Sequence, residues 1–304
     1  MKAKWSGVFP AVTTKIRADE SLDLAATQAS LARAIDAGVK GIVVLGMLGE
    51  NGMMTRVEKE SVVRAAKEVV AGRVPLLSGL AENTTGDAVA YARLCEGLGI
   101  DGLMVFPPLT YKTDARETIA YFEAIGAAAP SLGLMIYNNP VAYRLDVTPE
   151  LLERMAGIEN VVCIKEESYD IRRVTDIQKR CGDRFLVFCG IDDFLLESVA
   201  AGATGWVSGM TNAWPRECVE LFELCASGHF LQARALYKIM IDAFHLDTEV
   251  KLVQYIKLAE HLTYGASEHL RAPRLTLVGA ERERVIAIIE RAKAELAARR
   301  AKAG

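Results

Sequence analysis

Short apolar runs alternate with longer amphipathic stretches from residue 7 to residue 207. The short runs predict buried strands, because apolar and β-branched side chains fit a covered, pleated sheet. In the stretches between them, apolar residues recur at the spacing of a helix that buries one face. The predicted strands are residues 7–10, 41–45, 75–80, 102–106, 132–137, 161–165, 185–189 and 204–207.

Several of the amphipathic stretches carry helix-start signals. Thr55 with Glu58, and Asp114 with Glu117, have the spacing at which a cap residue and an acidic residue bond each other's backbone N–H groups. Thr148 stands before a proline, which suits the first turn of a helix. The helices predicted between strands are residues 22–37, 56–70, 87–98, 116–129 and 171–180.

Eight strands that alternate with helices predict a parallel sheet with right-handed crossovers. This is the count of a closed (β/α)8 TIM barrel, an α/β fold. An open doubly wound sheet is the alternative, but no G-x-G-x-x-G motif follows the first strand. Only helices are predicted after residue 207, at residues 215–227, 230–244, 250–264 and 281–298. We therefore expect a barrel domain of residues 1–210 and a helical extension of residues 211–304 packed on it.

Composition narrows the class of protein. The chain has 304 residues, 51% hydrophobic and 25% charged, with a net charge of -3, which indicates a globular protein that binds neither nucleic acid nor an anionic membrane. The N-terminus lacks the apolar core of a signal peptide, so we expect a cytoplasmic protein. The six cysteines form no C-x-x-C pair and read as reduced core residues. The four histidines match no zinc motif, and we expect no metal.

In a (β/α)8 barrel the active site lies at the C-terminal ends of the strands, and two residues there suggest Schiff-base chemistry. Lys165 ends the apolar run 161–164. Desolvation at such a position disfavours an ammonium ion, and a neutral amine attacks ketones to form Schiff bases. Tyr137 ends the preceding strand, where a phenol can move protons beside a carbinolamine. The alternatives are a lysine that snorkels to the surface and a core tyrosine. Glu166 and Glu167 either form a solvated face or orient the lysine.

Other strand ends supply further candidates. The turn at residues 46–49 can aim successive backbone N–H groups at a substrate carboxylate, or is simply a tight turn. Asp192 and Asp193 could hold a substrate hydroxyl or ammonium group, or could cap the helix that starts near residue 194. Gly190 and Ser208 end the seventh and eighth strands and are counted with the substrate-binding candidates.

These strand ends resemble the dihydrodipicolinate synthase / N-acetylneuraminate lyase family of class I aldolases. The matching motifs are G-x-x-G-E at 46–50, Y-N-x-P at 137–140, I-K-E at 164–166 and G-x-D-D at 190–193, in the family's order. The resemblance implies a (β/α)8 barrel without an external cofactor, in which Lys165 forms the Schiff base and Tyr137 shuttles protons. It also implies that the backbone of Met47 and Leu48 binds the carboxylate of a 2-oxo acid, and that the protein is a homotetramer.

The chain departs from the synthase pattern at three places. Met47 and Leu48 replace the two threonines of the family's G-T-T-G-E loop, so a threonine hydroxyl relay is absent. Tyr111, in the segment 109–112, lies near the place of a second tyrosine that the synthase takes from a neighbouring subunit. Arg144 is the candidate for the arginine that reads the semialdehyde's carboxylate. These departures make a dihydrodipicolinate synthase the less favoured interpretation.

A narrower resemblance concerns a bacterial subgroup that includes Δ1-pyrroline-4-hydroxy-2-carboxylate deaminases of hydroxyproline breakdown. The segments that resemble this subgroup are 106–108, 111–112, 138–143, 245–247, 251–254 and 256–260. A nearby subgroup contains 2-keto-3-deoxy sugar acid dehydratases. We expect the C-terminal segments among them to lie outside the barrel mouth.

The predicted reaction converts the pyrroline to 2-oxoglutarate semialdehyde and ammonia. Lys165 attacks C2, Tyr137 moves protons, and Asp192 or a water that it holds assists the departing C4 hydroxyl. The substrate is accordingly a small 2-oxo acid or cyclic imino acid. The alternatives are 2-keto-3-deoxyarabonate dehydratase, a sugar acid aldolase, dihydrodipicolinate synthase and a barrel that only senses a 2-oxo acid.

Overall fold

Eight parallel strands form the centre of the structure, a computed structural model that describes residues 4–108 and 111–303. The strands are β1 (Gly7–Pro10), β2 (Ile42–Val44), β3 (Leu76–Leu80), β4 (Gly102–Val105), β5 (Gly133–Asn138), β6 (Val161–Glu166), β7 (Leu186–Cys189) and β8 (Gly205–Ser208). Their order around the sheet is β1-β8-β7-β6-β5-β4-β3-β2. The Val12 backbone N–H donates to the Val43 carbonyl at 2.9 Å and joins the β1 side to β2. The expected (β/α)8 TIM barrel is therefore confirmed.

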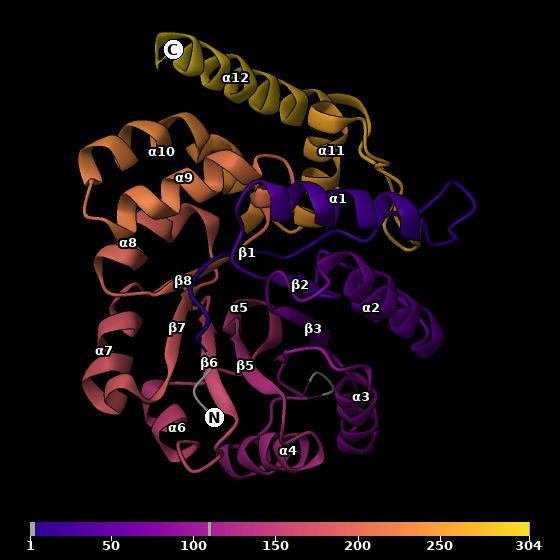
Figure 1. The fold of residues 1–304 in the computed structure, drawn as a ribbon, viewed down its shortest axis with the longest axis vertical. Helices are drawn as coiled ribbons and strands as arrows, with labels where there is room; N and C mark the ends of the chain where they lie inside the picture. Colours follow the sequence, from indigo (N-terminus) through magenta and orange to yellow (C-terminus); the bar gives the residue numbers. More distant parts are fainter. Residues whose placement is uncertain (1–3, 109–110, 304) are drawn as a thin grey trace.

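Helices surround the barrel on its outer face (Figure 1). They are α1 (Leu24–Asp36), α2 (Arg56–Val70), α3 (Thr85–Leu98), α4 (Ala115–Ala128), α6 (Pro149–Arg154), α7 (Arg172–Cys181), α8 (Leu195–Ala200) and α9 (Pro215–Ala226). The single turn α5 (Pro140–Tyr143) instead follows β5, and its Tyr143 packs against Tyr137 of that strand. Both expected capping boxes are present, with Thr55 and Asp114 as the cap residues. The Thr148 hydroxyl accepts from the Leu151 backbone N–H at 3.3 Å, so this helix start is also confirmed.

The interior of the barrel is filled by apolar side chains. Phe9 of β1 and Phe188 of β7 are fully buried and meet edge to face, with ring centroids 5.2 Å apart. Such aromatic pairs contribute packing energy beyond their buried area. The barrel is thus a solid core that holds the strand ends in place rather than a channel.

Helices α10 (Phe230–Phe244), α11 (Leu252–Tyr264) and α12 (Gly279–Ala303) lie together beyond α9 at one side of the barrel (Figure 1). A short 3-10 turn, η5 (His245–Thr248), joins α10 to α11. Helix α9 packs against α8 and β1, and α10 packs against α9. The division into residues 1–210 and 211–304 stays a prediction. Within the described residues, every helix is too short or too polar to cross a membrane.

Candidate active site

Lys165 and Tyr137 lie side by side at the C-terminal end of the barrel. Strands β5 and β6 pair with Tyr137 opposite Lys165, so alternation sends both side chains to the same face of the sheet. Lys165 is 7% exposed and Tyr137 is 3% exposed. The Lys165 Nζ atom stands 3.9 Å from the centre of the Tyr137 ring. The structure therefore brings together the two residues on which the predicted Schiff-base chemistry depends.

A carboxylate that the strand pattern left unassigned is paired with the lysine. The Glu167 Oε2 atom lies 2.8 Å from Lys165 Nζ, although their directions do not meet hydrogen-bond geometry. The other oxygen, Oε1, accepts a hydrogen bond from the Asn139 side chain at 2.8 Å. Of the two readings of Glu167, the one in which it orients the lysine fits this geometry. It also stands where a base could take a proton from a carbinolamine.

Glu166, one residue earlier, points away from this pair. Its side chain accepts hydrogen bonds from the Asn138 side chain at 3.0 Å and from the Ser168 backbone N–H at 2.7 Å. Burial raises the pKa of the Glu166 carboxyl. Glu166 thus braces the loops after β5 and β6 behind the site, and neither acidic residue forms a solvated face.

The Tyr137 hydroxyl is held as a neutral phenol. Burial raises its pKa well above the usual value of 10, and the negative charge of Glu167 adds to that effect. The hydroxyl accepts a hydrogen bond from the Asn139 side chain at 3.4 Å. The ring packs edge to face against Phe106 and Tyr143, at centroid distances of 4.9 and 5.4 Å. Tyr143 is not among the expected site residues, because a single helical turn is too short to give a periodic signal.

The turn after β2 presents two backbone donors. Strand β2 ends one residue earlier than expected, because Leu45 adopts a left-handed conformation with φ 56°. A Cβ atom on Gly49 would stand 2.7 Å from the Leu45 backbone, so this turn requires glycine there. Within the described part of the chain, the backbone N–H groups of Met47 and Leu48 donate to no other group. The turn can therefore receive a substrate carboxylate.

Buried ion pairs from α11 support this turn from behind. The Lys257 ammonium lies 2.5 Å from Glu50 Oε1, and both side chains are almost completely buried. A second pair joins Lys15, which follows β1, to Glu260 at 2.7 Å. Buried charges are stable only when they are paired. The helical extension thereby fixes the loops that follow β1 and β2.

Asp192 sits under the mouth of the barrel and is fully buried. Its carboxylate accepts hydrogen bonds from the Trp206 indole N–H at 3.0 Å and from the backbone N–H groups of Gly209 and Met210 at 3.3 and 2.7 Å. Burial raises its pKa to about 7 in spite of these donors. The capping interpretation is wrong, because neither Asp192 nor Asp193 caps the helix that follows.

Two further candidates shape the site through packing. A Cβ atom on Gly190 would stand 2.9 Å from Lys165 Cε, so the missing side chain makes room for the lysine. The Ser208 hydroxyl is fully buried and accepts hydrogen bonds from the Thr211 backbone N–H at 3.1 Å and hydroxyl at 2.7 Å. Their expected contact with a substrate stays a prediction.

Asp247, in η5, corrects the expectation that the C-terminal segments lie outside the barrel mouth. A Cβ atom on Gly209, the residue that follows β8, would stand 2.3 Å from Asp247 Oδ1. The Asp247 carboxyl is close enough to Asp192, Glu167 and Lys165 for their charges to act on it. Burial raises its pKa well above the usual range, and Asp192 adds to that shift. The helical extension thus contributes a carboxyl group to the candidate site.

Two expected residues do not join this cluster in the single chain. Tyr111 is 56% exposed, and its hydroxyl donates to Glu117 Oε1 at 2.9 Å. Leu109 and Thr110, which precede it in the fourth strand-end loop, lie outside the described residues. Arg144 is exposed on the surface after α5. Neither side chain reaches Lys165 here, so a role for either one requires a second subunit or a moved loop.

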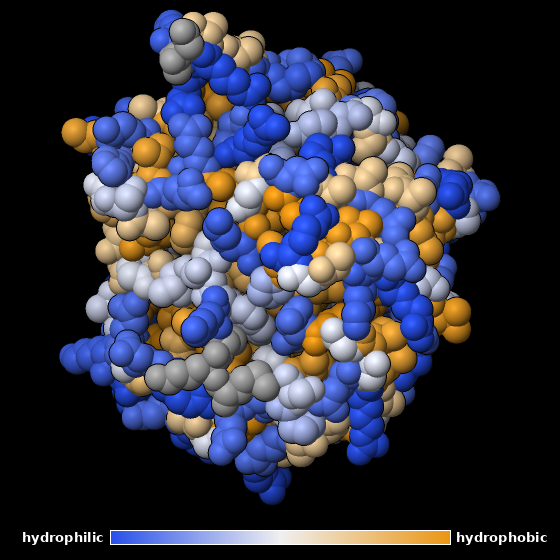
Figure 2. Space-filling view, viewed as in Figure 1, coloured by the Kyte–Doolittle hydropathy of each residue, from blue (hydrophilic) through white to orange (hydrophobic). Residues whose placement is uncertain are grey.

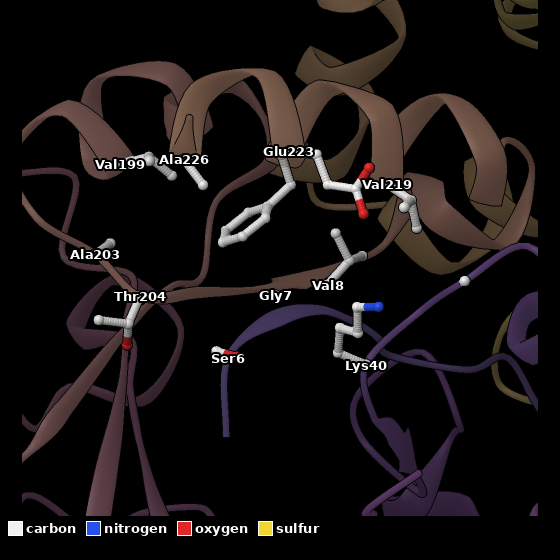
Figure 3. A pocket seen from close by; sticks show the side chains of 12 residues that line it. Ser6, Gly7, Val8, Lys40, Val199, Ala203, Thr204, Val219, Glu223 and Ala226 are labelled. Atoms are coloured by element: carbon white, nitrogen blue, oxygen red, sulfur yellow. The ribbon is translucent and has the colours of Figure 1, made fainter. Parts of the chain in front are cut away.

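One cavity of the structure lies away from the candidate site. A cavity of about 430 Å³ lies at the opposite end of the barrel, where residues before β1, β2 and β8 meet α9 (Figure 3). Lys40 and Glu223 are its charged residues, among mainly apolar neighbours. It contains none of the groups gathered around Lys165. Across residues 4–108 and 111–303, no cluster of three or more histidine, cysteine or acidic side chains could hold a metal ion.

The chain is similar in sequence to proteins of a known family. The sequence model of the dihydrodipicolinate synthetase family matches residues 4–292. The chain is 30% identical over 236 residues to a 4-hydroxy-tetrahydrodipicolinate synthase of Methanospirillum hungatei, covering 77% of this chain and 80% of that one. It is 28% identical over 289 residues to an uncharacterized DapA-like lyase of Rhizobium meliloti, covering 93% and 96%.

The fold is also similar to those of solved structures. The 4-hydroxy-tetrahydrodipicolinate synthase of Methylacidiphilum fumariolicum superposes with a TM-score of 0.92 at 26% identity, covering 97% of this chain and 98% of that chain. YagE from E. coli, a dihydrodipicolinic acid synthase family protein crystallised with pyruvate, superposes with a TM-score of 0.90 at 26% identity, covering 96% and 99%. Similarity therefore extends over the barrel and the C-terminal helices alike.

Proposed function

The chain belongs to the dihydrodipicolinate synthetase family, and we propose that within this family it is a deaminating lyase. Enzymes of the family are lyases that form a Schiff base through a lysine and use no external cofactor. The proposed reaction converts Δ1-pyrroline-4-hydroxy-2-carboxylate and water to 2-oxoglutarate semialdehyde and ammonia. The observation that carries the proposal is the contact of Lys165 with both a carboxylate and a neutral phenol in a nearly dry site.

The first half of the reaction exchanges one imine for another. The Lys165 amine adds to C2 of the ring, and the ring nitrogen then leaves C2 as a primary amine. Glu167 lies against the attacking nitrogen and takes the proton that it loses. The Tyr137 phenol, whose pKa is raised by burial, donates a proton to the departing nitrogen.

The second half is an elimination. The protonated Schiff base accepts the electron pair that is left when C3 loses a proton, and the resulting enamine expels the C4 hydroxyl as water. A proton then moves from C5 to C3, which gives an enamine at the other end of the chain. Water hydrolyses this enamine to the aldehyde and ammonia, and a second water releases the 2-oxo group from Lys165.

The turn after β2 favours this substrate over a more hydroxylated one. The free N–H groups of Met47 and Leu48 suit the ring carboxylate, while their side chains offer no hydroxyl for a sugar acid. A site that lacks hydrogen-bond partners for extra hydroxyl groups leaves those groups unsatisfied on binding, at roughly 1–3 kcal/mol each. A small ring with one hydroxyl avoids most of that penalty.

Two other activities that use a Schiff-base lysine are the alternatives to the proposed one. The names of the similar proteins favour 4-hydroxy-tetrahydrodipicolinate synthase. Against it stand the missing threonine hydroxyls at Met47 and Leu48 and the exposed position of Tyr111. A 2-keto-3-deoxyarabonate dehydratase would use the same lysine and the same loss of a C4 hydroxyl.

A substrate panel distinguishes the three activities. We expect kcat/KM for the pyrroline, measured as ammonia and semialdehyde release, to exceed that for 2-keto-3-deoxyarabonate and for pyruvate with aspartate semialdehyde. If kcat/KM for 2-keto-3-deoxyarabonate exceeds that for the pyrroline by more than about tenfold, roughly 1.4 kcal/mol of transition-state binding, the protein is a dehydratase and not a deaminase. Condensation of pyruvate with aspartate semialdehyde at the highest rate would make the protein a synthase.

We also propose that the protein acts as a cytoplasmic homotetramer. Apolar patches separated by hydrophilic side chains lie on the face shown in Figure 2. Large apolar side chains that are mostly exposed in the single chain include Val250, Leu275 and Val278. Light scattering during size-exclusion chromatography should give four times the mass of one chain. If it gives the mass of a single chain, Tyr111 has no neighbouring site to reach.

A further inference from the structure

We propose that Asp247, which comes from the helical extension, is the general acid that protonates the C4 hydroxyl as it leaves. This assignment rests on the proposed elimination and names a catalytic residue for it. It differs from the expectation that Asp192 or its water assists this step. It also explains why the extension reaches the mouth of a barrel that already has its eight strands and the Schiff-base lysine.

The position of Asp247 is fixed by contacts of its own carboxyl and of the chain that leads into its turn. Its Oδ1 atom lies 2.3 Å from where a Cβ atom on Gly209 would stand, so the carboxyl packs directly on the chain that leaves β8. The turn itself is tied to the loop after β7, because His245 Nδ1 lies 2.7 Å from Asp193 Oδ2. The Tyr237 hydroxyl of α10 also donates to the Asp193 carbonyl. These contacts hold the Asp247 carboxyl at the mouth.

The groups that face Asp247 decide which carboxyl carries a proton. They are Asp192 and Asp193 after β7, Lys165 of β6 and Glu167, which follows β6. Two neighbouring carboxyl groups in a poorly hydrated site cannot both be ionised, so they share a proton. Asp192 receives three N–H donors, which stabilise its charged form. Asp247 receives no hydrogen bond from the described residues, so the shared proton favours Asp247.

Three of the neighbouring acidic or phenolic groups are engaged in other contacts. Glu167 pairs with the lysine, and the Tyr137 ring packs over the lysine at 3.9 Å. Asp192 is completely buried, and its two oxygens accept hydrogen bonds from the protein. Asp247 as a whole residue has intermediate exposure, and its carboxyl oxygens accept no hydrogen bond from the described residues. It is therefore the acid in this cluster best placed to meet a group on the substrate.

The step balances without any further reactant. The electron pair of the enamine forms the C3–C4 double bond, and the C4–O bond breaks. The departing oxygen takes the Asp247 proton and leaves as water. Asp247 becomes a carboxylate and recovers a proton from solvent before the next turnover.

The test compares a poor leaving group with a good one in the Asp247→Asn variant. The two substrates are the 4-hydroxy pyrroline and its 4-fluoro analogue, because fluoride departs with little help from an acid. We expect kcat for the hydroxy substrate to fall by about 10²-fold or more, the usual scale for losing a positioned acid. The fluoro substrate should lose less than about fivefold. Pyruvate should still be trapped on Lys165 by borohydride and still exchange its methyl protons with D2O.

The matched control is Asp242→Asn on α10. Asp242 is exposed and pairs with Arg291, away from the mouth, so this variant should keep wild-type rates with both substrates. Should Asp247→Asn fail to fold, Gly209→Ala provides a second variant, because its methyl group would displace the Asp247 carboxyl without removing it. It should show the same selective loss with the hydroxy substrate.

The possible outcomes separate this inference from the proposed function. Equal losses with both leaving groups, or no loss with either, overturn the acid role of Asp247 in an enzyme that still eliminates. Loss of pyruvate exchange in Asp247→Asn would show that the residue supports the Schiff base instead. A wild-type enzyme that exchanges pyruvate protons but releases no ammonia from the pyrroline overturns the proposed function itself.

Discussion

Replacing Asp192 by asparagine should make the free energy of unfolding less dependent on pH. The Asp192 carboxyl is fully buried, and burial raises its pKa from 3.8 to about 7. The folded protein therefore holds a proton there that the unfolded chain has released, between about pH 4 and pH 7. In that window the native state binds more protons, so raising the pH lowers the free energy of unfolding. Asparagine resembles the protonated acid in shape and has no such proton to lose.

The magnitude follows from the size of the shift. Each pKa unit corresponds to roughly 1.4 kcal/mol, so the wild type should lose about 2–3 kcal/mol between pH 5 and pH 8 through this group. Because Asp192 shares a proton with Asp247, we expect a loss of stability toward the lower end of this range. At pH 5 the two proteins should differ by no more than about 1–2 kcal/mol. At pH 8 the variant should have gained about 2 kcal/mol relative to the wild type.

Urea unfolding followed by circular dichroism at pH 5, 6, 7 and 8 measures this difference. Protein concentration must be equal in all samples, because an oligomer gains stability with concentration. Titrating groups that do not interact with Asp192 cancel in the difference between the two proteins. Asp242→Asn, at an exposed position, should show no pH-dependent difference. The difference in the free energy of unfolding between Asp192→Asn and wild type should change from pH 5 to pH 8 in favour of the variant. If that difference stays constant, or changes in favour of the wild type, the pKa of Asp192 is not raised.

Four further predictions concern the site and its support. Lys165→Ala should abolish the borohydride-trapped adduct with pyruvate while circular dichroism stays unchanged; an adduct on another lysine in the wild type would contradict the assignment. Tyr137→Phe should lower kcat by about 10²-fold with a smaller change in KM, and near-normal turnover would show that another group moves the proton. Gly190→Ala should slow adduct formation at least about tenfold, because the new methyl group would stand 2.9 Å from Lys165 Cε; an unchanged rate would mean that the lysine has spare room. Lys257→Met should lower stability by about 3 kcal/mol, because it leaves the buried Glu50 with only the more distant Arg274, at 3.7 Å, as a countercharge, and a Tm equal to the wild type's would show that Arg274 replaces the lysine.

The barrel could be predicted from the sequence because each strand and helix has its own local signal. Buried parallel strands are continuous apolar runs, and the surrounding helices show one apolar face and defined caps. The strand-end rule then located Lys165 and Tyr137, since a polar residue that closes an apolar run must lie at the mouth. The register of β5 and β6, with these two residues opposite each other, agrees with that inference.

The remaining parts of the site depend on contacts between distant segments. Asp247 reaches the mouth because its turn docks on the loop after β7, and nothing in residues 245–248 alone indicates that docking. Tyr143 enters the aromatic cluster through a single helical turn. Lys257 did leave a trace in the sequence, because it stands among apolar residues of α11, but its partner Glu50 lies 207 positions away. Local patterns cannot pair residues across such separations.

Alternation along β6 explains why the residues after the lysine differ so sharply in role. Lys165 faces the inside of the barrel, so Glu166 must face outward, where it binds the neighbouring loop. Glu167 lies beyond the strand, and the chain there turns back toward the lysine and brings the two charges together. The same lysine, carboxylate and tyrosine could serve either an aldol reaction or an elimination. What favours elimination is an acid near C4, and the proposed acid, Asp247, comes from η5 between α10 and α11 rather than from the strands. The choice of reaction in this barrel therefore depends on the helices outside it, and variants of the extension should change the products before they change the Schiff base.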